Sequence, residues 1–221
     1  ARRNPDGRTL SESVPADLYA RWAELKPRYI GRNAGIERWR PVFAAQELYE
    51  AAMRRAGLSQ ANVVSPVVAA AARRHGVPRI STQVEVRVSD PKAMIREFNR
   101  TTLADTDCFA KTLARIEGDL DAMRRRANAW AIGDVAALRD LPMEDQYVAC
   151  MRAFTGNAVA QKIGFGDVST RSTATWVAAA EAALQANTST FATLPIPFLL
   201  REKGVLATLR AKGYAVEAPD E

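Results

Sequence analysis

The sequence predicts an α/β fold in which helices dominate and a small mixed sheet completes a single domain over residues 1–221. Apolar residues recur at alternating spacings of four and three over one long stretch, which indicates an amphipathic helix. Residues 83–88 alternate between valine and polar side chains, which is typical of a strand. Almost half of the chain is apolar, so it can bury a sizeable core.

Helices are expected to fill the N-terminal third. An apolar stripe with spacings of four, three and four predicts a helix that Pro15 begins. The stripe is formed by Leu18, Trp22, Leu25 and Tyr29. A second helix is expected from Pro41 to Arg55, and a third from Pro66 to the glycine at position 76.

The longest helix is expected from Asp105 or Thr106 to about Ile132, with Gly133 ending it. Its apolar seam comprises Phe109, Leu113, Ile116, Leu120, Met123, Ala127 and Trp130. Such a seam predicts an antiparallel partner helix within the chain, and a homodimer partner is the alternative. On the opposite face, we expect Asp121 to pair with Arg125 at i,i+4.

Two more helices are expected after this long helix. The first begins at Pro142 and places Cys150 on its apolar face. The second is capped by Ser169 or Thr170 and continues to about Ala186.

Three short segments are predicted to form the mixed sheet. Residues 83–88 alternate most clearly, and residues 190–194 and 214–216 are short runs rich in β-branched and aromatic side chains. Between the last two, Gly204 opens a helical run that Gly213 ends. A helix between two strands is an arrangement that builds parallel or mixed sheets.

Composition narrows the functional classes. The net charge of +6 comes from 31 basic and 25 acidic side chains that are spread along the chain. The densest basic run, Arg124 to Arg126, has no interleaved aromatics, so we predict a solvated helix face and no nucleic-acid partner. No apolar run approaches the ~20 residues of a membrane span. No P-loop, dinucleotide fingerprint or C-x-x-C pattern occurs, and no cofactor is predicted.

The C-terminal stretch from Asn187 to Pro219 resembles the last unit of the TraB/GumN family, which is related to the TIKI proteases and the erythromycin-esterase and ChaN-like proteins. The family pattern is a strand, a G-x-x-H motif, a turn, a helix and a closing G-Y-x-V. The matching positions are residues 191–194, Gly204, Leu209, Gly213, Tyr214 and Val216. The G-x-x-H motif falls on Pro195, Ile196, Pro197 and Phe198.

The resemblance extends over most of the chain. Leu10-Ser11, residues 70–76, Ala129-Trp130 with Gly133-Asp134, and Trp176 look like further family segments. The family's first strand and first G-x-x-H motif would lie before Ala1, so we expect this chain to be a mature form or the C-terminal portion of a longer protein.

In the family, a metal held by the histidines of the two G-x-x-H motifs is thought to act in hydrolysis. The second histidine position is Phe198 here, and the single histidine, His75, is expected at a helix C-terminus as a dipole partner. The resemblance therefore implies no metal and no catalytic residue in this chain.

We predict a catalytically degenerate protein that binds a peptide or a small ligand in the former active-site cleft. The candidate cleft residues are Glu85, Arg171, Trp176, Pro195 and Phe198. One alternative is a metal-dependent hydrolase whose ligands lie on an N-terminal segment absent from this chain. A second alternative is a helical structural or interaction module.

Family relatives are typically exported, so the resemblance implies a periplasmic or secreted protein. In that setting we expect Cys108 and Cys150 to lie close together as a disulfide, because each lies on one of two helices that follow one another. Two buried free thiols are the alternative.

Overall fold

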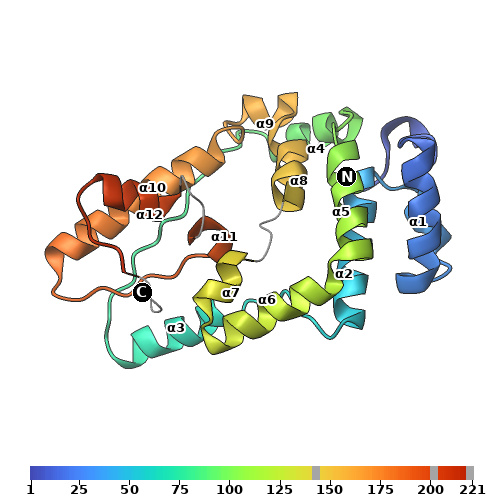
Figure 1. Cartoon of the computed structure of the whole chain (residues 1–221). Coiled ribbons are helices and arrows are strands. Elements are labelled where there is room, and N and C mark those ends of the chain that lie inside the picture. The colour runs from blue at the N-terminus through green and yellow to red at the C-terminus, as the bar shows by residue number, and fades with distance from the viewer. Residues whose placement is uncertain (141–144, 200–203, 218–221) are drawn as a thin grey trace. The chain divides into compact units, whose positions relative to one another are not determined.

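The computed structural model describes residues 1–140, 145–199 and 204–217 (Figure 1). The chain divides into two compact units. Unit 1 contains Ala1–Ser59 and Val86–Gly166, and unit 2 contains Gln60–Glu85 and Asp167–Glu221. Both units are helical, so the prediction of a helix-rich chain is confirmed.

The described residues of unit 1 form two 3-10 helices and a set of α-helices. They are η1 (Pro5–Gly7), α1 (Ala16–Tyr29), η2 (Ala34–Arg38), α2 (Pro41–Arg55), α4 (Pro91–Arg100), α5 (Thr106–Gly118), α6 (Leu120–Ile132), α7 (Val135–Asp140), α8 (Asp145–Thr155) and α9 (Ala158–Lys162). The expected start of α8 at Pro142 lies outside the described residues.

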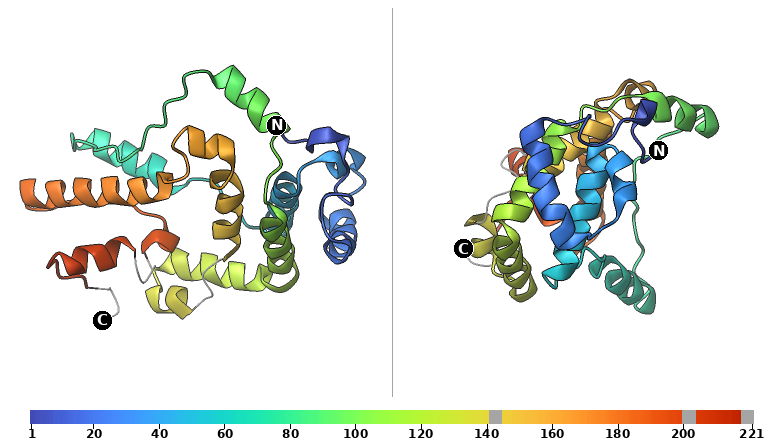
Figure 2. Two further views of the ribbon diagram at one scale, coloured as in Figure 1. Left: turned by 90° about the horizontal axis from the view of Figure 1, so that it is seen from above. Right: turned by 90° about the vertical axis from the view of Figure 1, so that its right-hand side faces the viewer.

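The core of unit 1 forms where α5 packs between α2 and α8, with α1 against α2. Figure 2 shows α1, α2 and α5 side by side. The predicted stripe of α1 faces inward, since Leu18, Trp22 and Leu25 are buried. The Trp22 ring lies 5.7 Å from the ring of Phe109 on α5. The α5 part of the predicted seam therefore packs inside the chain, as expected.

The predicted helix from Asp105 to Ile132 is broken, and this part of the prediction is wrong. Helix α5 ends at Gly118 and α6 begins at Leu120, with Asp119 between them at φ −129°. Glycine loses the most backbone freedom in a helix, so a Gly-Asp pair is a weak point at which the direction can change. Beyond the break Met123 is buried, but Trp130 is 46% exposed.

The charged face of α6 also differs from the prediction. Asp121 accepts a hydrogen bond from Arg124 at 2.8 Å, at i,i+3 spacing, and Arg125 is not the observed partner. Both spacings bring side chains together on a helix, so the pattern alone does not select between them.

The predicted sheet is absent from the described residues, and this is the main correction to the fold class. Residues 83–88, 190–194 and 214–216 lie outside helices, but none of them pairs in a ladder. One isolated antiparallel bridge, between Arg3 and Trp39, is the β-pairing found in the described part. Alternation predicts extended backbone, whereas a sheet also needs a partner strand, which local sequence does not supply.

The described part of unit 2 contains α3 (Val64–Arg74), α10 (Val168–Ala186), α11 (Ile196–Leu199) and α12 (Val205–Ala211). Helices α10 and α12 pack together through Val177, Val205 and Leu209. Gly213 has φ 93° directly after the C-cap of α12, as the predicted helix end requires. No described helix is both long and apolar enough to cross a bilayer.

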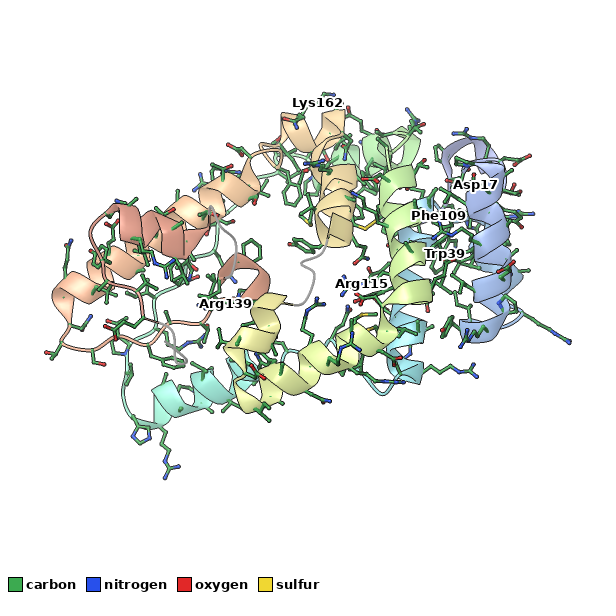
Figure 3. All side chains as sticks on the ribbon, viewed as in Figure 1. Asp17, Trp39, Phe109, Arg115, Arg139 and Lys162 are labelled. Carbon is green, nitrogen blue, oxygen red and sulfur yellow. A yellow bond between two sulfur atoms is a disulfide. The ribbon has the colours of Figure 1, made fainter. Side chains whose placement is uncertain are left out.

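The disulfide is present. Cys108 on α5 is bonded to Cys150 on α8 across 42 residues (Figure 3). The bond lies in a cluster of apolar side chains that includes Val42, Leu103 and Ala149. It fastens α8 to the helix at the centre of unit 1.

Candidate functional site

An apolar groove of about 340 Å³ lies on unit 2. Helices α3 and α10 form its floor, and residues 77–82 and 187–193 form its walls. Figure 2 shows α3, α10 and these connecting segments. We refer to this feature as the unit 2 groove.

The sequence of α10 explains why the groove is open. Its inner residues Ala179, Ala180 and Ala183 end at Cβ, so little side-chain volume fills the space above them. One turn earlier, the half-buried Trp176 closes one part of the floor and also packs on the cluster between α10 and α12. Alanine favours the helix and leaves room for a ligand at the same time.

The structure brings one predicted cleft residue, Trp176, into the groove. Arg171 lies on the first turns of α10 and forms an ion pair with Asp167 at 2.9 Å. Glu85 is exposed at the end of an extended segment. Pro195 is exposed, and its carbonyl accepts hydrogen bonds from the N–H groups of Phe198 and Leu199 at the start of α11. Of these five predicted residues, only Trp176 is among the groove lining.

Arg79, Ile80 and Phe191 are among the groove residues that were not predicted from the sequence. Ile80 is 64% exposed and Phe191 is 78% exposed, which is unusual for large apolar side chains. The available signal for Phe191 was its position on residues 190–194, which were expected to be extended, so that alternate side chains face opposite directions.

A second, more polar groove of about 550 Å³ lies between α10 and α12. Its charged pair, Glu181 and Lys212, is joined by an ion pair at 3.0 Å. The hydroxyls of Thr173 and Thr208 donate to carbonyls of their own helices. These polar groups are already partnered, so this groove is the weaker candidate.

Unit 1 contains buried charge that acts as structural support. Arg40 is 1% exposed, and its guanidinium donates to the carbonyls of Arg3, Phe98, Asn99 and Thr101 at 2.7–3.1 Å. Burial lowers the pKa of Arg40, and the nearby Asp105 carboxylate opposes this effect. Every one of these donors is directed at backbone, so the cluster offers no open position for a substrate.

Two further charged groups in unit 1, the buried Arg115 and the half-buried Glu37, also have partners within the fold. The Arg115 guanidinium, labelled on α5 in Figure 3, lies 5.6 Å from the centre of the Tyr49 ring, and burial lowers its pKa. Glu37 accepts hydrogen bonds from Trp22 Nε1 at 3.2 Å and from Tyr19 at 3.4 Å, and it pairs with Lys26 at 2.8 Å. These contacts fasten η2 to α1.

The described residues contain no group of three or more His, Cys, Asp or Glu side chains that could hold a metal ion. His75 is exposed and forms the C-cap of α3, the helix-end position predicted for it. Its N–H bonds to the carbonyl of Ala71, so the backbone there continues the helical pattern for one more step.

A sequence model of the TraB/PrgY/gumN family matches residues 1–218. The chain belongs to this family. Neither the curated proteins nor the solved structures compared with the chain gave a match.

The match confirms the family resemblance predicted from the sequence. Leu194, Leu209 and Tyr214 lie at positions aligned with the family pattern. All three belong to the apolar cluster that contains Val177 of α10. The position aligned with the second histidine, Phe198, lies in α11 and is half-buried.

Proposed function

We propose that this TraB/PrgY/gumN protein binds a peptide or a small apolar ligand in the unit 2 groove and has no hydrolytic role of its own. The observation that supports this proposal most directly is the combination of an alanine floor, Trp176 and exposed apolar walls. Binding sites of small ligands are concave and mainly apolar, with a few polar groups that set orientation.

The exposed side chains add to this argument. Val77, Ile80 and Phe191 line the groove and are each more than half exposed. Large apolar groups that gather around a concave surface mark an interaction site more often than single scattered ones do. A ligand that covers them would gain roughly 25 cal/mol for each Å² of apolar surface removed from water.

Localisation outside the cytoplasm is part of the same proposal. A disulfide between Cys108 and Cys150 is consistent with an oxidising compartment, where such bonds persist. Together with the export expected for family relatives, this supports a periplasmic or secreted location. The ligand would then be one that is present in that compartment.

The test uses a matched pair of variants on α10. Ala180 lines the groove, whereas Ala182 is exposed and outside the lining. Ala180→Phe should fill the floor and weaken binding of the apolar dye anilinonaphthalene sulfonate, and of peptides that displace it, by about tenfold or more. Ala182→Phe should leave binding unchanged. Equal binding by both variants would show that the groove is not the site.

A further inference from the structure

The two walls of the unit 2 groove have unused main-chain hydrogen-bonding groups. Between residues 78 and 84, the described hydrogen bond from a backbone N–H is that of Gln83 to Ser81 Oγ, a local contact at 3.4 Å. Between residues 188 and 194, no backbone N–H of the described chain donates to another segment. The walls are extended, but in the described chain nothing pairs with them.

Unpaired extended backbone beside an apolar groove is complementary to one kind of ligand. A peptide in extended conformation can hydrogen-bond through its own N–H and C=O groups while alternate side chains enter the groove. Residues 77–82 would span roughly 20 Å, which is long enough for about six residues of such a peptide. A compact apolar molecule would leave the backbone groups of the walls without partners.

The charge of the groove further restricts the class of ligand that it can bind. Arg79 is the charged residue of the lining, and it forms no ion pair with another described residue. Arg73 and Arg74 lie at the end of α3 on the same connection, and both are exposed. No acidic residue occurs from Gln60 to Val84, so this part of unit 2 is basic.

We infer that the unit 2 groove binds an extended apolar peptide that adds as a strand to residues 77–84 and places an acidic group beside Arg79. The inference rests on the proposed function and specifies its ligand class. Main-chain pairing supplies much of the affinity, and the open alanine floor and Trp176 accept apolar side chains at alternate positions.

The test titrates the full chain with capped seven-residue peptides of alternating valine and threonine. Each peptide carries one glutamate, at its N-terminal end in one peptide and at its C-terminal end in the other. In a strand, N–H groups of alternate residues point to opposite sides. If the N–H groups of the odd-numbered peptide residues face residues 77–84, N-methylation of those residues should weaken binding about tenfold. N-methylation of the even-numbered residues should then change the affinity by no more than about twofold, and the two sets exchange roles if the even-numbered N–H groups face the wall. The protein is unchanged in this comparison, so folding defects play no part.

A matched pair of arginine variants tests the acidic group. Arg79→Gln should weaken binding of the glutamate peptide by roughly two- to fivefold, as expected for a solvent-exposed ion pair. It should not change the binding of a peptide that has glutamine in place of the glutamate. Arg210→Gln removes the same charge from α12, outside the groove lining, and should have no effect.

The outcomes separate this inference from the proposed function. Ala180→Phe could abolish peptide binding while methylation of the odd-numbered and of the even-numbered residues weakens it equally. This result would overturn strand addition and would retain the groove as the binding site. Absence of all dye and peptide binding would overturn both. Concentration-dependent dimerisation that blocks the peptide would show that a second copy of the chain is the occupant, and would overturn the peptide assignment.

Discussion

Cys108 and Cys150 are bonded with their Cα atoms 4.5 Å apart, and Thr112, one turn after Cys108, lies beside the Cys150 sulfur. The Thr112 hydroxyl also accepts a hydrogen bond from Gln146 on α8 at 3.0 Å. The covalent bond and the hydrogen bond therefore hold the same faces of α5 and α8 together. Loss of the disulfide should loosen α8 first.

The Cys108→Ser, Cys150→Ser double variant should be less stable than the parent chain. The bond closes 42 residues, which corresponds to about 4 kcal/mol in the chain-entropy model. Urea unfolding of the double variant should have a lower midpoint and a free energy of unfolding that is smaller by a similar amount. The oxidised parent chain should run faster than the variant on a non-reducing gel. The reduced parent chain is the control, and it should resemble the double variant. Coincident unfolding curves for oxidised and reduced chains would contradict the prediction.

The pH dependence of stability should contain a contribution from Asp105. Burial raises the pKa of Asp105 above its usual 3.8, although the hydrogen bond from the Val42 N–H and the charge of Arg40 oppose the shift. The folded chain then holds this proton more tightly than the unfolded chain. The contribution of Asp105 is therefore fully present below pH 3.8 and is lost as the pH rises through the higher folded pKa.

Asp105→Asn provides the comparison, because an amide does not titrate in this range. The difference in unfolding free energy, parent minus variant, should shift in favour of the parent as the pH falls from 7 towards 4. Urea unfolding at several pH values measures this difference. A constant difference, or one of the opposite slope, would contradict the raised pKa.

Two glycines of unit 1 should respond in opposite ways to alanine. Gly133 has φ 75° at the end of α6, where a Cβ is strained, so Gly133→Ala should cost about 1 kcal/mol of stability. Gly118 is the last residue of α5, has no positive φ and has no atom within 4 Å of an added Cβ. Gly118→Ala should therefore stabilise the chain by roughly 0.5 kcal/mol or more. Thermal unfolding of both variants checks the two signs.

The chain should contain no stoichiometric metal. Tight sites use three or four nitrogen, oxygen or sulfur donors in a fixed arrangement, and Phe198 has none to contribute. Elemental analysis after purification without added metal should find zinc, manganese and iron well below one per chain, and Phe198→His should not raise this content. Stoichiometric metal together with chelator-sensitive cleavage of peptides would establish the hydrolase alternative instead.

Local patterns predicted the helices well, because apolar periodicity and helix ends depend on residues within a few turns. The stripe from Leu18 to Leu25 and the glycine at position 213 are examples. The sheet was not predictable in the same way, since the alternation at 83–88 determines an extended backbone but not its partner. The break after Gly118 depends on the balance between the entropic cost of glycine in a helix and the packing of the side chains around it. Apolar periodicity carries no information about this balance.

One of the five predicted cleft residues lines the candidate groove. Trp176 was identified through alignment with the family, and the structure places it in the unit 2 groove. Arg79 and Phe191 were missed because a groove arises from segments that are far apart in the sequence. Neither side chain signals a site by itself, and only the fold places both of them beside the alanines of α10.

The Arg40 cluster has a consequence for the order in which unit 1 assembles. Its acceptors belong to Arg3, 37 positions before Arg40, and to residues 98–101, about sixty positions after Arg40. Such contacts close large loops, and they become favourable only after the segments between them are in place. We therefore expect this cluster to form after the folding transition state, so that Arg40→Met would accelerate unfolding far more than it slows folding.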